Sequence, residues 1–300
     1  MLASRSRLQI AKADIATSLD ERRSHVLKYR EFGAILRDHR AEWRLAVNTS
    51  VSDFIEFLLK SSDLKRYEFD FPHRPETLYV WKNVPTMEML LHLKHDSFYS
   101  HYTAMRMHGL TEQVPAAIYV SHERMGYDFG DEEKPDPIEQ PAIDEAFQQP
   151  ARITKNTALF GDRRIVLIHG GYTGKIGVVS ETITFGTDGM AEVRMTDLER
   201  TLIEATAKPW YSGGVAEVAK AFEQAKSKAQ INRLGALLKK LNYAYPYHQA
   251  IGYYMERAGY RSAQIDLLRR FPRERDFYLD HEMSNPVYVK DWRLWVPKGF

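Results

Sequence analysis

The feature that most restricts the fold is a strong helix start near residue 50. Ser50 precedes Asp53 by three residues, directly before an apolar run that begins at Phe54. A hydroxyl and a carboxylate at this spacing satisfy free amides of a first helical turn. We therefore predict a helix of about three turns over residues 51–61.

The segments around this helix suggest a known arrangement. Residues 29–38 carry apolar side chains at helical spacing, and a second short helical pattern follows around 41–47. After the helix, residues 64–69 and 76–81 alternate as strands do, with a turn between them that contains His73 and two prolines. Three short helices followed by a two-stranded ribbon is the order of a winged helix-turn-helix.

The rest of the chain predicts a mixed α+β domain. With 300 residues, 44% of them hydrophobic and 27% charged, the chain suits about two globular domains. Pro85 marks a boundary, so we predict an N-terminal arm with a winged helix at 1–83 and an α+β domain at 84–300. In that second domain, helical patterns are expected at 86–94, 101–108, 197–207, 215–229, 231–242 and 247–258, and strands at 117–121, 164–169, 176–185, 277–279 and 292–296.

The near-neutral total charge of +2 conceals a strongly uneven distribution. Residues 1–45 carry a net +4, residues 121–150 a net −7 and residues 151–300 a net +7. Basic segments attract anionic partners even when the total is small, although ordinary solvated surface explains the same counts. The block at 128–137 is acidic and rich in Pro and Gly, and it predicts an exposed loop.

The catalytic motifs that the sequence suggests are all incomplete. The turn at 170–175 lacks the first glycine of a phosphate loop, because His169 stands there. His122-Glu123 and His281-Glu282 lack the second histidine of a zinc protease, and the chain contains no cysteine, no Gly-x-Ser-x-Gly and no Asp-x-Asp. We therefore expect no enzyme, no cofactor and no metal. We also expect no membrane association and a cytoplasmic location.

An unusual concentration of tyrosine lies near residue 245. The chain places five tyrosines within residues 243–254. Such a group can form a partner-binding face or stack on bases, and it can equally form an aromatic layer inside a domain. The residues predicted for partner binding are Tyr243, Tyr245, Tyr247, His248 and Tyr253.

Several longer strings resemble a known family. They are SHYTAMRMHGLTEQVP at 100–115, TDLERTLIEA at 196–205, LNYAYPYHQAIG at 241–252, FYL at 277–279 and WRLWVPK at 292–298. On these strings the sequence resembles the AbiEi antitoxin family of type IV toxin–antitoxin systems over about residues 25–300. The resemblance implies an N-terminal winged helix that binds operator DNA of its own operon as an autorepressor. It also implies a C-terminal domain that counters a nucleotidyltransferase-like toxin, directly or indirectly, in phage defence.

The predicted DNA contacts surround the third helix. The expected exposed positions of that helix include Asp53 and Glu56, and carboxylates repel phosphates, so we expect phosphate contacts from flanking basic residues. The predicted DNA-binding residues are Arg37, Arg40, Arg44, Asn48, Thr49, Ser50, Ser52, Lys60, Lys65, Arg66, His73 and Arg74. Two alternatives stay open: a protein-interaction module that clasps a partner without binding DNA, and a nucleic-acid-processing enzyme with a cryptic site.

Overall fold

The computed structural model describes residues 6–124, 138–186 and 189–300. The predicted acidic loop at 128–137 lies outside these residues. The chain has a mixed α+β fold and divides into two compact units. Unit 1 contains residues 1–97, 158–160 and 182–193, and unit 2 contains residues 98–157, 161–181 and 194–300.

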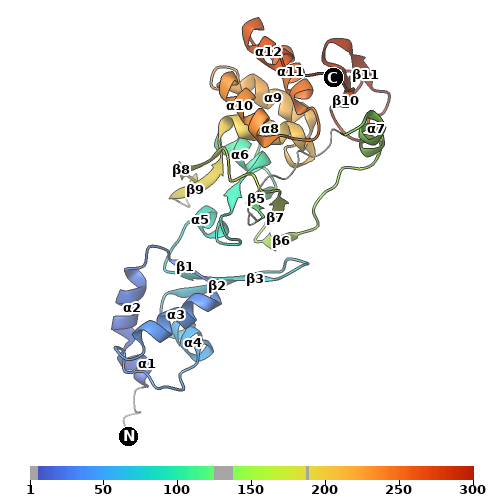
Figure 1. The fold of residues 1–300 in the computed structure, drawn as a ribbon. Coiled ribbons are helices and arrows are strands. Elements are labelled where there is room, and N and C mark those ends of the chain that lie inside the picture. The colour runs from blue at the N-terminus through green and yellow to red at the C-terminus, as the bar shows by residue number, and fades with distance from the viewer. Residues whose placement is uncertain (1–5, 125–137, 187–188) are drawn as a thin grey trace. The chain divides into compact units, whose positions relative to one another are not determined.

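Unit 1 is built mainly from an N-terminal run of helices and short strands (Figure 1). In chain order these elements are α1 (Arg7–Ile10), α2 (Lys12–Asp20), β1 (Val26–Leu27), α3 (Tyr29–His39), α4 (Val51–Ser61), β2 (Leu64–Phe69), β3 (Glu76–Trp81) and α5 (Thr86–Leu90).

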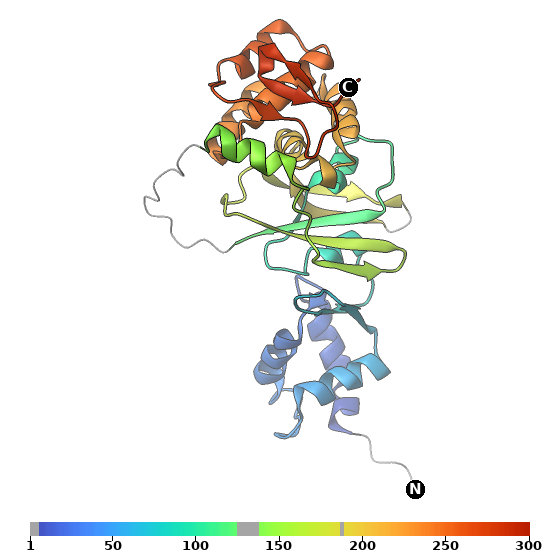
Figure 2. The ribbon, with the colours of Figure 1, turned by 90° about the vertical axis from the view of Figure 1, so that its right-hand side faces the viewer.

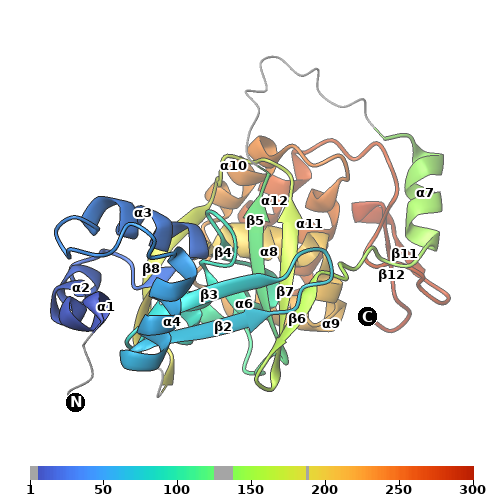
Figure 3. The ribbon, with the colours of Figure 1, turned by 90° about the horizontal axis from the view of Figure 1, so that it is seen from below.

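The strands of this N-terminal run form one small antiparallel sheet. Its order is β1-β3-β2, so that β3 lies in the centre and pairs with both neighbours. Figure 3 shows β2 and β3 side by side with α3 and α4 nearby. Phe32 of α3 meets the rings of Phe54 and Tyr79 edge-on, at centroid distances of 6.2 Å and 5.2 Å. These aromatic contacts join the two helices to the sheet in one apolar core.

Local patterns predicted most of unit 1, with two corrections. The helix at 51–61 and the strands at 64–69 and 76–81 are confirmed. The short helix expected around 41–47 is wrong, because this segment forms turns whose Trp43 and Leu45 are buried. The N-terminal arm was predicted without helices of its own, whereas α1 begins at Arg7 and α2 follows it to Asp20.

Unit 2 contains most of a six-stranded sheet. The strands are β4 (Phe98–Tyr99), β5 (Ala117–Glu123), β6 (Thr157–Phe160), β7 (Arg163–Gly170), β8 (Val178–Thr184) and β9 (Met190–Thr196), in the spatial order β6-β7-β5-β4-β9-β8. Strand β5 runs parallel to β7 and antiparallel to β4. Ile165–Ile168 of β7 are all buried, which explains the continuous apolar run in the sequence.

The helices of unit 2 lie on one side of its sheet (Figure 2). They are α6 (His101–Met107), α7 (Gln140–Gln148), α8 (Leu198–Ala207), α9 (Val215–Ala225), α10 (Ile231–Leu241), α11 (Tyr247–Arg257) and α12 (Ser262–Arg269). Of these, α7 and α12 escaped prediction. Among the described residues no helix has both the length and the apolarity that crossing a bilayer requires.

A second small sheet, near the C-terminus, packs beside α7 and α11. It contains β10 (Phe277–Tyr278), β11 (Val287–Val289) and β12 (Leu294–Val296) in the order β10-β12-β11. Just before β12, the fully buried Trp292 lies directly against α11 at Gly252. A Cβ atom at residue 252 would stand 2.1 Å from that indole ring, so this position requires glycine.

Candidate nucleic-acid interface and a buried polar cluster

The start of α4 is held by a reciprocal cap. The Oγ of Ser50 accepts from the amide of Asp53 at 3.0 Å, and the Asp53 carboxylate accepts from the amide of Ser50 at 3.1 Å. Hydrogen bonds from the side chain and then the backbone of Ser50 lower the pKa of Asp53. The carboxylate therefore stays charged, but it turns back toward the cap.

The outer face of α4 is polar, as the spacing predicts. Ser52, Asp53, Glu56 and Lys60 are exposed, and the buried face carries apolar side chains. Lys60 Nζ lies 3.1 Å from a carboxylate oxygen of Glu56. The two charges offset each other locally, so the second predicted repulsive carboxylate is partly neutralised by its own helix.

Arg40 organises the segment that leads into α4. Its guanidinium donates to the backbone carbonyls of Ala46, Val47 and Thr49 at 2.5, 3.2 and 2.9 Å. This side chain therefore holds the turn that carries Asn48, and backbone oxygens occupy three of its five N–H donors.

Two groups of the predicted residues lie on neighbouring elements without sharing one site. Asn48, Thr49, Ser50 and Ser52 follow one another at the start of α4. Lys65 and Arg66 are exposed on β2, and the exposed His73 and Arg74 lie in the turn between β2 and β3.

The exposed basic residues differ in how far they are engaged. Lys65 Nζ donates to the side-chain oxygen of Asn83 at 3.1 Å, and Arg66 pairs with Glu68 at 3.2 Å. Arg37 pairs with its neighbour Asp38 at 3.5 Å, and all these contacts are at the surface. Surface pairs of this kind are weak, so the cations can exchange them for phosphate oxygens.

One exposed residue escaped prediction. Tyr29 begins α3 with 53% of its surface exposed, and its hydroxyl lies 3.3 Å from the Oγ of Ser52. The two residues are far apart in the chain, so spacing alone gives no signal of their contact. Tyr29 therefore extends the polar surface around the start of α4.

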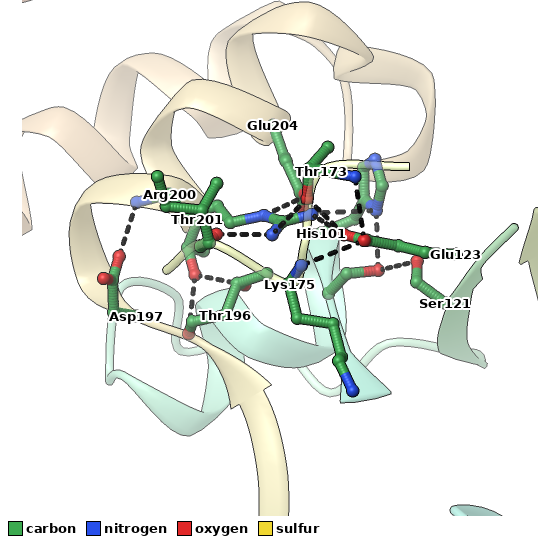
Figure 4. Close-up of polar contacts among 12 residues, drawn as sticks. His101, Ser121, Glu123, Thr173, Lys175, Thr196, Asp197, Arg200, Thr201 and Glu204 are labelled. Carbon is green, nitrogen blue, oxygen red and sulfur yellow. Dashed lines mark hydrogen bonds and ion pairs between the residues drawn. The ribbon is translucent and has the colours of Figure 1, made fainter. Parts of the chain in front are cut away.

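Unit 2 contrasts with this surface by burying a set of charged side chains, which we call the Arg200 cluster (Figure 4). Arg200 donates to Glu204 at 2.9 Å, to Glu123 at 3.2 Å and to the carbonyl of Ile176 at 2.5 Å. Glu123 in turn accepts from the amides of Thr173 and Lys175. The cluster thus ties α8, the end of β5 and the loop after β7 together.

Burial changes the ionisation of the groups around Arg200. Burial raises the pKa of Glu204, and one of its oxygens has no hydrogen-bond partner. That oxygen lies 4.0 Å from Nδ1 of His101, whose pKa burial lowers well below its usual value. Glu123 behaves differently: burial opposes ionisation, yet hydrogen bonds from Thr173 and Lys175 with the charge of Arg200 leave its pKa lowered.

Most of the predicted tyrosine group lines one pocket of about 400 Å³ in unit 2. Tyr243, Tyr245, Tyr247 and His248 contribute to its wall. Tyr253 lies apart from it, since its hydroxyl donates to the carbonyl of Phe300. Among the described residues no group of His, Asp and Glu has the arrangement of a metal site.

Comparison with known proteins bears on the fold alone. No protein-family model and no curated protein matches the sequence. Among solved structures, the crystal structure of the RV2827C protein from Mycobacterium tuberculosis is similar, with a TM-score of 0.56 and 13% sequence identity. The similarity covers 97% of this chain and 93% of that one, so the same fold extends over both proteins.

Proposed function

We propose that the chain is an AbiEi-like antitoxin of a type IV toxin–antitoxin system, and that unit 1 is a winged helix-turn-helix that binds operator DNA of its own operon. The observation that carries the proposal is the element order α2-β1-α3-α4-β2-β3 with the sheet order β1-β3-β2. In this arrangement α4 is the recognition helix and the β2–β3 turn is the wing.

The exposed side chains divide the proposed contacts into two kinds. Asn48, the N-cap Ser50 and Ser52 are exposed at the start of α4. This is the end at which a recognition helix contacts base edges in the major groove. Lys65, Arg66, His73, Arg74, Arg37, Arg44 and Lys60 supply phosphate contacts. Arg40 acts indirectly, because it positions the turn that carries Asn48 and Thr49.

A gel-shift titration with the promoter region of the protein's own operon tests this proposal. Replacing Lys65, Arg66 and Arg74 together by alanine removes three of the proposed phosphate contacts. Because phosphate contacts contribute most to affinity at low salt, we expect the triple variant to bind at least about tenfold more weakly there. Its affinity should also depend less steeply on salt concentration. The matched control replaces the exposed Arg152, Lys240 and Lys298 of unit 2, which removes the same charge elsewhere.

The two variants distinguish the outcomes. Equal affinity of the triple variant and wild type would rule out the proposed wing and flank contacts. An equal loss in both variants would indicate attraction by total charge alone. If wild type binds no promoter DNA, the alternative holds, in which unit 1 is a protein-interaction module; the acidic Asp53 and Glu56 on α4 favour that alternative.

We also propose that the predicted domain at 84–300 counters a nucleotidyltransferase-like toxin without catalysing a reaction itself. The strings at 100–115 and 196–205 that support the family resemblance lie in this region. Co-expressing residues 84–300 and residues 1–83 separately with the neighbouring toxin gene tests the division. Growth rescue by 1–83 alone would contradict it, and co-purification of toxin with the full chain distinguishes direct from indirect antagonism.

A further inference from the structure

The pocket lined by the tyrosine group, here called the α11 pocket, has two buried polar atoms that nothing satisfies. His248 and Gln249 lie in the first turn of α11 and line this pocket, with 9% and 0% of their surfaces exposed. His248 Nε2 and Gln249 Oε1 have no hydrogen-bond partner. Buried polar atoms are nearly always paired, so two orphans in adjacent residues suggest an absent ligand.

Both orphan atoms are hydrogen-bond acceptors. The amide nitrogen of Gln249 already donates to backbone carbonyls of Arg275, Trp292 and Arg293, which fixes its oxygen as the free group. A ring N–H of His248 donates to the backbone of Pro272, which leaves Nε2 as an acceptor. A matching ligand therefore presents hydrogen-bond donors, such as the two N–H groups of an amine.

The walls of the pocket favour a flat ring. Tyr243 is 37% exposed and meets Tyr247 edge-on at 5.2 Å, while Phe271 stacks on the imidazole of His248 at 5.2 Å. Aromatic side chains of this kind stack on nucleobases irrespective of sequence. Burial raises the pKa of Tyr247, so its hydroxyl remains protonated.

Two cationic side chains, Lys239 and Arg275, line the pocket. Lys239 lines the pocket and lies 5.6 Å above the ring of Phe271, and among the described residues no carboxylate pairs with it. Arg275 also lines the pocket, but Glu139 and Glu274 engage its guanidinium at 3.3 and 3.8 Å. Lys239 is thus the cation available to an anionic group next to the ring.

We propose that the α11 pocket binds a nucleotide whose base carries an exocyclic amino group, with the base amine at His248 and Gln249 and the phosphate at Lys239. Adenine, cytosine and guanine offer such an amine, and uracil does not. The orphan atoms are covered in the free chain, so binding in this mode requires a neighbouring ring to turn aside. The nucleotide is either free or the end of an RNA strand, and the site is independent of the DNA contacts proposed for unit 1.

Calorimetric titration of the full chain with ATP, CTP, GTP and UTP tests the proposal. We expect the three amino-bearing nucleotides to bind at least about fivefold more tightly than UTP, adenosine or inorganic tripolyphosphate, because only they satisfy both ends of the site. A single-stranded oligocytidylate compared with CTP identifies the source: the tighter of the two is the physiological form.

Variants separate the pocket from general charge. Lys239→Gln should lower the affinity for ATP by about tenfold. The matched Lys240→Gln changes an exposed lysine outside the pocket and should leave that affinity unchanged. His248→Phe preserves the stacking on Phe271 and should abolish the preference for ATP over UTP. Absence of binding at about 5 mM nucleotide, binding of tripolyphosphate as tight as ATP, or equal effects of the two lysine variants would each overturn the proposal.

Discussion

The two units each contain charged pairs, and two pairs on the surface of unit 1 lie in the opposite environment to the Arg200 cluster of unit 2. In unit 1 the Glu56–Lys60 and Arg66–Glu68 pairs are exposed to solvent. In unit 2 the side chains of Arg200, Glu123 and Glu204 are at most 11% exposed. Exposed pairs contribute little to stability and exchange partners easily, whereas a buried charge needs its partner. Unit 1 can therefore offer Lys60 and Arg66 to a ligand without weakening its fold, whereas unit 2 cannot offer Arg200 in this way.

The largest expected effect comes from breaking the Arg200 cluster. Arg200→Ala leaves Glu123 and Glu204 buried without their cation, and we expect a loss of about 3–5 kcal/mol in the free energy of unfolding. Urea denaturation of the full chain, followed by circular dichroism, measures it. Lys220→Ala, which removes a mostly exposed lysine 3.6 Å from Glu217, should cost less than about 1 kcal/mol. Equal losses would remove the contrast between buried and exposed charged pairs.

The next effect is a pH dependence that originates inside unit 2. Burial lowers the pKa of His248 to about 4, against 6.5 for the free side chain. Between these values the unfolded chain takes up a proton that the folded chain refuses, so stability falls as pH falls from 6.5 to 4. His248→Phe should remove about 3 kcal/mol of this decline.

Urea denaturation at pH 7.5 and at pH 4.5 measures that difference. At pH 7.5 the imidazole is neutral in both the folded and the unfolded chain, so this measurement gives the baseline cost of the substitution. Parallel pH profiles for wild type and the variant would show that His248 titrates normally.

A smaller effect is expected at the start of α4. Ser50→Ala removes the hydroxyl that accepts from the amide of Asp53, and loss of such a cap costs about 1 kcal/mol. Thermal unfolding of the full chain measures the cost. The control is Ser52→Ala, which changes an exposed serine two residues further along. It should change the free energy of unfolding by less than about 0.5 kcal/mol.

The smallest expected effect concerns the exposed Glu56–Lys60 pair on α4. Under the proposed DNA binding, Glu56→Gln removes a carboxylate from the outer face of α4 and releases Lys60 for phosphate contact. We expect affinity for promoter DNA to rise about two- to fivefold at low salt, with the gain shrinking at high salt. Glu223→Gln, an exposed change in unit 2, should have no effect. A decrease for Glu56→Gln would place that carboxylate in base recognition.

The parts of the fold that were predicted depend on local signals. Ser50 and Asp53 lie within one turn, and the alternation in 64–69 and 76–81 is legible in each strand alone. Strand β1 has only two residues, Val26 and Leu27, and it forms by pairing with β3. No local pattern in the sequence predicts it.

The Arg200 cluster was unpredictable for a similar reason. Its carboxylate partner Glu123 is 77 residues from Arg200 in the chain, and the loop at Thr173 comes from a third segment. In the sequence His122-Glu123 looked like a failed zinc motif. The tyrosine group was recognised by composition, but the pocket also needs Lys239, Phe271 and Arg275 from other elements.

The turn before α4 shows how Arg40 constrains change in the chain. Its guanidinium contacts backbone carbonyls, which every residue possesses, at Ala46, Val47 and Thr49. Substitution at the exposed Val47 or Asn48 leaves those oxygens in place, whereas inserting or deleting one residue shifts them away from the donors. This turn can therefore vary widely in sequence, and with it the side chains ahead of α4, as long as its length is kept.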